Sequence, residues 1–135
     1  MPSPKEIVNT MMAADLFSQW LGITVLETGL GNCKIKLTVR KEMINGFGIA
    51  HGGITYCLSD SALAFASNSH GPQAVSIETS ISHTAKVLVG DVLIAEAKEL
   101  SRSKKIGFYE VTIKNQDDKI VSLFKGTVYI TEKNW

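Results

Sequence analysis

Hydrophobic residues recur along the chain with two different periods. Between about Lys5 and Trp20 they stand three or four residues apart, which predicts a short amphipathic helix that ends near Gly22. Residues 23–40 instead alternate between hydrophobic and polar positions around a turn at 29–32. This second period predicts a β-hairpin with one face in water.

The segment from His51 to about His70 is hydrophobic or small on every side. It is long enough for a helix of roughly 28 Å, and a helix without a polar face is buried on most sides. Alternation with period two then returns in four runs, separated by turns at 89–91, 101–105 and 115–119. The pattern predicts four further strands in a meander and an α+β fold, in which an antiparallel sheet wraps one central helix.

Composition adds limits to this picture. A chain of 135 residues with 44% hydrophobic content fits one packed domain spanning 1–135. A net charge of +1 gives no long-range field, so neither nucleic acid nor a membrane is expected as a partner. Cys33 and Cys57 are expected to be ordinary reduced thiols. No signal peptide or transmembrane segment is recognised, which makes a cytoplasmic location the expectation.

One carboxylate, Asp60, lies in the middle of the hydrophobic segment, and no cationic residue stands three or four positions away. Burying a carboxylate without a cation is costly unless hydrogen bonds or water satisfy it. Two interpretations stay open. Asp60 is either a structural aspartate, hydrogen-bonded in the core or on an open helix face, or a desolvated carboxylate that acts as general base or nucleophile.

The sequence His51-Gly52-Gly53 leads directly into the predicted helix. Glycines there would let a ligand approach backbone N–H groups at the positive end of the helix dipole, although they would equally suit a tight entry turn. Along a helix, His51 and Asp60 are roughly 13 Å apart, whereas groups acting on one carbonyl must lie within about 3 Å of it. If both ends act on one carbonyl, the simplest arrangement is a two-fold dimer in which Gly52 of one subunit faces Asp60 of the other.

The spacing of these residues resembles a known family. Asn45, the His51–Gly53 motif and Asp60, followed by an alternating strand, are similar to the hotdog-fold acyl-CoA thioesterases, and within them to the phenylacetic acid degradation thioesterases. The similarity extends over about 20–130. It implies a hotdog fold, a homodimer with sites at the subunit interface that assembles further into a homotetramer, and hydrolysis of an acyl-CoA substrate without metal or organic cofactor.

The resemblance also implies roles for five residues. Asp60 matches the catalytic carboxylate, and Gly52 matches the backbone N–H that polarises the thioester carbonyl. Asn45 would support that polarisation or position the substrate. Ser76 falls where relatives carry a hydroxyl that orients the attacking water, and His51 is expected to position neighbouring groups rather than to transfer a proton.

Three further residues, Gly53, His83 and Lys104, are expected to contact substrate. For Lys104, contact with the CoA phosphates and a merely solvated hairpin turn are both consistent with the sequence. Many relatives carry an aromatic-Leu-Arg-Pro segment where this chain has SHTAKVLVGD at 82–91. That departure concerns substrate preference more than chemistry.

The expected substrates are aryl or hydroxyaryl acetyl-CoA esters, with medium-chain acyl-CoA as the alternative. Two other functions are weighed against hydrolysis. A hotdog dehydratase or hydratase would rely on motifs such as HFP or GDxNPxH, which the sequence lacks. A non-catalytic acyl-CoA binding protein could keep the pocket without the acid, so the joint presence of Asn45, Gly52, Asp60 and Ser76 favours an enzyme.

Overall fold

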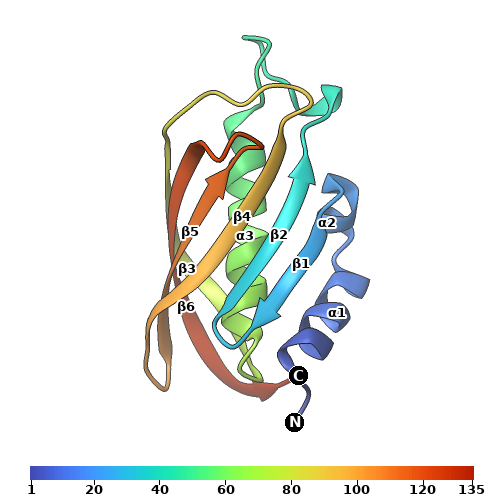
Figure 1. Ribbon diagram of the computed structural model, residues 1–135. Helices are drawn as coiled ribbons and strands as arrows, with labels where there is room; N and C mark the ends of the chain where they lie inside the picture. Colours follow the sequence, from blue (N-terminus) through green and yellow to red (C-terminus); the bar gives the residue numbers. More distant parts are fainter.

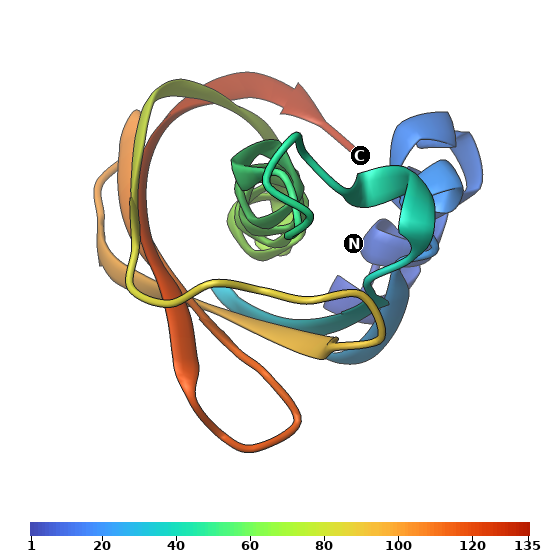
Figure 2. The ribbon, with the colours of Figure 1, turned by 90° about the horizontal axis from the view of Figure 1, so that it is seen from above.

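The computed structural model describes residues 1–135. Its elements, in chain order, are α1 (Pro4–Ala14), α2 (Leu16–Leu21), β1 (Thr24–Gly29), β2 (Asn32–Thr38), the 3-10 helix η1 (Lys41–Met43), α3 (Gly52–Asn68), β3 (Pro72–His83), β4 (Val92–Arg102), β5 (Ile106–Lys114) and β6 (Ile120–Asn134). Figure 1 shows the sheet curved along α3, and Figure 2, seen from above, shows the sheet surrounding much of the helix. The predicted α+β hotdog fold is confirmed.

The sheet has six antiparallel strands in the order β1-β2-β4-β5-β6-β3. Three of the last four strands form the predicted meander, but β3 pairs with β6 at the sheet edge, so the prediction of a four-strand meander was wrong. The reason is the long connection between His83 and Val92, which runs past the N-terminal end of α3 from one side of the curved sheet to the other instead of turning back tightly (Figure 2). A hydrogen bond of 2.8 Å from the Ala50 N–H to the Val87 carbonyl ties this connection to the loop before α3.

The predicted N-terminal helix is present but is interrupted at Asp15, which ends α1 and caps α2. One carboxylate oxygen of Asp15 accepts from the Ser18 N–H at 2.9 Å. Aspartate competes for backbone N–H groups in this way, and it therefore favours helix caps over helix interiors. The interruption gives the N-terminal segment two short helices that lie beside β1 (Figure 1).

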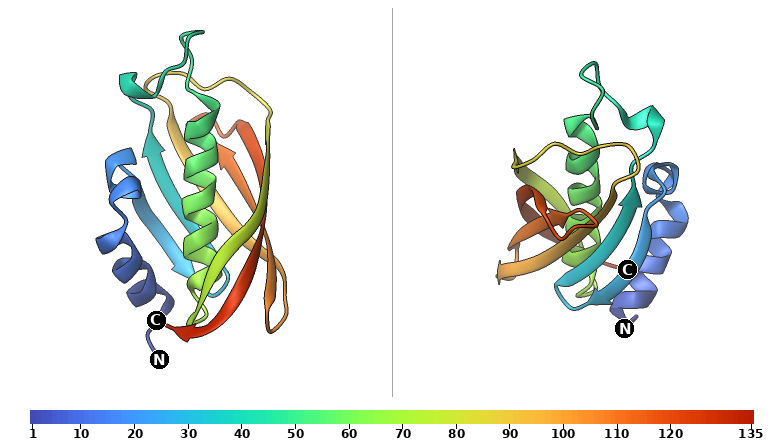
Figure 3. Two further views of the ribbon diagram at one scale, coloured as in Figure 1. Left: turned by 180° about the vertical axis from the view of Figure 1, so that it is seen from behind. Right: turned by 45° about the horizontal axis from the view of Figure 1, so that its top comes forward.

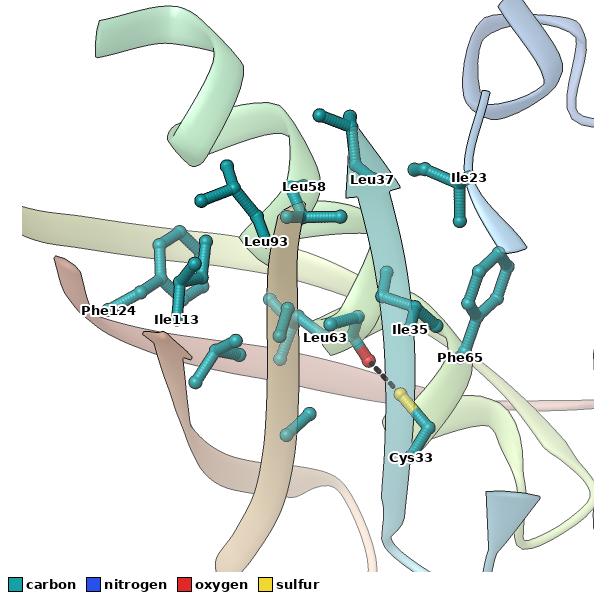
Figure 4. Close-up of a cluster of buried hydrophobic side chains, with 14 of the residues drawn as sticks. Ile23, Cys33, Ile35, Leu37, Leu58, Leu63, Phe65, Leu93, Ile113 and Phe124 are labelled. Atoms are coloured by element: carbon teal, nitrogen blue, oxygen red, sulfur yellow. Dashed lines mark hydrogen bonds between the residues drawn. The ribbon is translucent and has the colours of Figure 1, made fainter. Parts of the chain in front are cut away.

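The hydrophobic core fills the space between α3 and the concave face of the sheet (Figure 4). Side chains buried there include Ile35, Leu37, Leu58, Leu63, Phe65, Leu93, Ile113 and Phe124. Leu63 of α3 packs closely against Gly126 on β6, where an added Cβ would lie 2.5 Å from Cδ2 of Leu63. None of the helices combines the length and hydrophobic content needed to span a bilayer.

One face of α3 is left uncovered by the sheet. Gly53, Cys57, Asp60 and Ala64 follow one another at three- and four-residue intervals, and all are half-buried or exposed. We call these four residues the open stripe. The expected burial of the helix on most sides is present elsewhere along α3. Seen from behind, α3 lies between the N-terminal helices and β3, and no strand runs in front of it (Figure 3, left).

Candidate active site

The N-terminal end of α3 presents one free backbone donor. His51 is the N-cap residue, and its Nδ1 accepts a hydrogen bond from the Gly53 N–H at 2.8 Å. The N–H of Gly52, by contrast, has no hydrogen-bond partner in the chain. Of the two glycines expected to meet substrate, only Gly52 offers an unused donor, and it does so at the positive end of the helix dipole. A free N–H in this electrostatic position is suited to act as an oxyanion-hole donor.

A cleft of about 420 Å³ opens beside Gly52, with Asn45 on its wall. The Oδ1 of Asn45 accepts from the Phe47 N–H at 2.9 Å, which holds the loop before α3 in shape. The side-chain nitrogen of Asn45 has no partner in the chain. Asn45 therefore orders the loop with one end of its amide and keeps the donor end free.

His83 lies against the same helix end and lines the cleft beside Gly52. Its Nδ1 is 3.3 Å from Oγ1 of Thr55, and that hydroxyl donates to the Gly52 carbonyl at 3.1 Å. A Cβ at Gly52 would lie 3.2 Å from Nε2 of His83. The sequence analysis missed Thr55, although its position three residues after Gly52 on a helix was a usable signal.

Asp60 lines a second cavity of about 260 Å³, together with Ser76 of β3. The structure thus brings the carboxylate and the hydroxyl into one cavity. Burial raises the pKa of Asp60 above its usual range, and the nearby charge of Asp15 raises it further. None of the chain's ion pairs involves Asp60. Asp60 is accordingly a proton acceptor stronger than an ordinary aspartate.

The two halves do not meet within one chain. Gly52 and Asp60 are separated by about 12 Å along the helix axis, and they line different cavities. Lys104 lies in the turn between β4 and β5, at the opposite end of the sheet from Gly52 (Figure 1). His70 is engaged elsewhere, since its Nε2 is 2.8 Å from Oε1 of Glu99.

Comparison with known proteins bears on what this arrangement does. Residues 47–122 match the thioesterase superfamily. A putative esterase of Archaeoglobus fulgidus is 38% identical over 93% of this chain and 81% of its own length. The acyl-coenzyme A thioesterase PaaI of Escherichia coli is 35% identical over 87% of this chain and 84% of its own.

Solved structures agree with the sequence matches. The E. coli PaaI protein from the phenylacetic acid degradation operon has a TM-score of 0.95 at 31% identity, covering 97% of this chain and 95% of its own. A Streptococcus mutans protein bound to acetyl-CoA has a TM-score of 0.81 at 25% identity, covering 84% and 91%. The chain therefore belongs to the thioesterase superfamily and is an acyl-CoA thioesterase of the PaaI type.

Proposed function

We propose that this enzyme hydrolyses aryl or hydroxyaryl acetyl-CoA esters at sites shared between two subunits. The observation that carries the proposal is the unused Gly52 N–H at the start of α3, on the same helix that presents Asp60 on its open stripe. The E. coli relative is an acyl-coenzyme A thioesterase, and the E. coli PaaI protein of known structure comes from the phenylacetic acid degradation operon. The origin in that operon favours an arylacetyl substrate.

In the proposed reaction, the thioester carbonyl oxygen accepts a hydrogen bond from the Gly52 N–H, with Asn45 beside it. Asp60 of the partner subunit takes a proton from a water oriented by the Ser76 hydroxyl, and that water attacks the carbonyl carbon. The tetrahedral intermediate collapses by breaking the C–S bond, and the CoA thiolate leaves and takes up a proton. Direct attack by Asp60 to give an anhydride is the alternative; we favour the water route because Ser76 lines the same cavity.

Two features of the single chain support a dimer. Strand β3 is a free edge of the sheet, and it exposes 55% of Val75 and 60% of Ile77. Exposed hydrophobic edge strands are pairing sites for another chain. A two-fold partner across β3 and the open stripe would cover these side chains, and would let the Gly52 cleft of one subunit face Asp60 of the other. Further assembly into a homotetramer is the remaining expectation.

The cavity beside Asp60 supports the choice of acyl group. Its volume is about 260 Å³, and its lining includes Leu63, Ala64 and Val128. A hydrophobic cavity of about 150 Å³ is enough to hold benzene, so a single aromatic ring fits with room for its methylene carbon. These features favour a short aromatic acyl group over a long flexible chain.

A kinetic panel tests the substrate. Release of free CoA thiol would be measured with phenylacetyl-, hydroxyphenylacetyl-, benzoyl- and straight-chain acyl-CoA esters. We expect the highest kcat/KM for the arylacetyl esters. A higher value for a medium-chain ester would overturn the proposed acyl group while leaving the thioesterase activity in place.

Complementation between subunits tests the shared site. Two differently tagged variants, Gly52→Pro and Asp60→Asn, would be co-expressed, and the heterodimer isolated by both tags. Each parent should be inactive, whereas the heterodimer contains one intact site and should recover about half of the wild-type activity. A heterodimer as inactive as its parents would contradict a site built from two chains.

A further inference from the structure

A hydrogen-bonded link connects the N-terminal helices to the residue that follows Asp60. The two carboxylate oxygens of Asp15 accept from the Ser18 N–H at 2.9 Å and from the Ser18 hydroxyl at 2.6 Å. The same Ser18 Oγ lies 2.8 Å from Oγ of Ser61. Ser18 is only 1% exposed and Ser61 9% exposed, so the link is shielded from water. Asp15 is therefore held in one orientation beside the helix that carries Asp60.

Few other charges face Asp60. On α3 the neighbouring titratable groups are Tyr56, whose hydroxyl is hydrogen-bonded to Oγ1 of Thr79, and Cys57, whose pKa is raised by burial and by the charge of Asp60. The β3 and β6 side chains that line the cavity beside Asp60 are uncharged. The charged residues of β2 and β5, and those in the first half of β4, alternate with buried hydrophobic residues and point to the outer face of the sheet.

The remaining charged groups near these elements are bound to other residues or lie far from Asp60. Glu99 of β4 is bound to His70, beyond the C-terminal end of α3. The glutamate of β1 pairs with a lysine of β2, and the charged residues of α1 lie in its exposed first turn. Arg40 donates to the Trp20 carbonyl at 2.7 Å, near the end of α2 opposite Asp15. No ion pair of the chain neutralises Asp15.

We propose that Asp15 is a positioning residue for the hydrolysis: its fixed negative charge makes Asp60 a stronger proton acceptor. The inference rests on the proposed role of Asp60 as the base. A like charge disfavours the ionised carboxylate of its neighbour, and a base with a greater affinity for protons abstracts one from water more readily. The direction of the effect agrees with the raised pKa of Asp60, to which burial contributes most and Asp15 adds.

The test separates the charge of Asp15 from its capping role. Asparagine is as good an N-cap as aspartate, so Asp15→Asn removes the charge and keeps the bond from the Ser18 N–H that caps α2. Its amide NH₂ replaces the oxygen that accepts from the Ser18 hydroxyl, and that hydroxyl can accept from the NH₂ instead. We expect the acid limb of the kcat/KM profile to move to lower pH, and the plateau value to fall about two- to fivefold because the base is weaker. Asp15→Glu keeps the charge but caps poorly, and its acid limb should stay close to that of the wild type.

A matched control removes a carboxylate elsewhere. Asp118 lies in the turn between β5 and β6 with φ of 61°, a conformation that asparagine also tolerates. Asp118→Asn should therefore leave the pH profile unchanged. If Asp15→Asn gives too little folded protein, Asp15→Ser supplies a second neutral cap for the same measurement.

Two outcomes would overturn the inference. One is an unmoved acid limb in a folded neutral variant at position 15. The other is an equal shift in Asp15→Glu, which would assign the effect to the cap and not to the charge. In either case the role of Asp60 stands or falls separately, because Asp60→Asn tests it directly: turnover by that variant would contradict the proposed function whatever Asp15 does.

Discussion

The two halves of the proposed site are built in different ways, although one helix carries both. The hydrogen bonds that shape the donor end come from neighbours in sequence, since His51 occupies the Gly53 N–H and Thr55 binds the Gly52 carbonyl, while His83 packs against this end from β3. The surroundings of Asp60 come from distant segments, namely α2 and β3. The donor should therefore respond to local changes of the backbone, whereas the strength of the base should respond to remote side chains.

The largest expected effect is the loss of the base. Asp60→Asn keeps the size of the side chain and removes its ability to accept a proton, so kcat/KM should fall about 10²- to 10⁴-fold. Thiol release from an arylacetyl-CoA, with circular dichroism as the check of folding, measures this. Wild-type turnover by the folded variant would exclude Asp60 as base and as nucleophile.

Removal of a single backbone donor should come next. Gly52→Pro deletes the free N–H at a helix position where proline is favoured, and the ψ of 138° at His51 suits a residue before proline. We expect a loss of about 10²- to 10³-fold in kcat. Gly52→Ala is the matched control, because it keeps the N–H and only presses on His83. Equal losses in both variants would assign the effect to crowding, and not to the donor.

A smaller effect is expected at the hydroxyl beside Asp60. Ser76→Ala should lower kcat by roughly tenfold and leave KM nearly unchanged, because the hydroxyl orients water and not substrate. Steady-state kinetics with one arylacetyl-CoA ester suffices. An increase in KM at constant kcat would instead make Ser76 a substrate contact. Ser76 is exposed on an edge strand, so its replacement by alanine should cost little stability, and the loss of kcat can be assigned to the missing hydroxyl.

The smallest expected effect is on stability, and it tests the surroundings of Asp60 without measuring catalysis. Because the pKa of Asp60 is raised in the folded chain, folding disfavours its ionised form, and the cost is present at a pH above the folded pKa. The cost disappears as the pH falls below the unfolded pKa, where Asp60 is protonated in both states. Asp60→Asn should thus raise Tm slightly at neutral pH and leave it unchanged in acid. A lower Tm at neutral pH would contradict this sign.

Local patterns predicted the parts of the fold that depend on neighbouring residues. The hairpin turn at 29–32 and the helix from His51 onward were visible because turn residues and hydrophobic period are short-range signals. The pairing of β3 with β6 was not predicted, because it depends on the path that the connection between His83 and Val92 takes past the end of α3. Strand order is decided by packing and not by the alternation within a strand.

The candidate site likewise has parts that the sequence predicted and parts that it did not. The resemblance assigned the polarising N–H to Gly52, but the residues alone did not show that the Gly53 N–H is bound by His51, because that depends on the orientation of the His51 ring. The sequence also did not reveal Asp15, which is 45 positions before Asp60 and reaches it only because α2 packs beside α3. The sequence alone indicated the candidate residues. The influence of one charged residue on another could be inferred only from the three-dimensional structure.

The glycine at position 126 affects where α3 lies relative to the sheet and to a partner subunit. Leu63 is only 1% exposed, so its side chain cannot rotate into solvent to make room. A methyl group at Gly126 would therefore displace α3 away from the sheet. Gly52 and Asp60 would then shift together relative to β3 and to any partner subunit, while their mutual spacing stayed the same. Strand β6 supplies no reacting atom, but the small size of its Gly126 determines how closely the catalytic helix packs on the sheet.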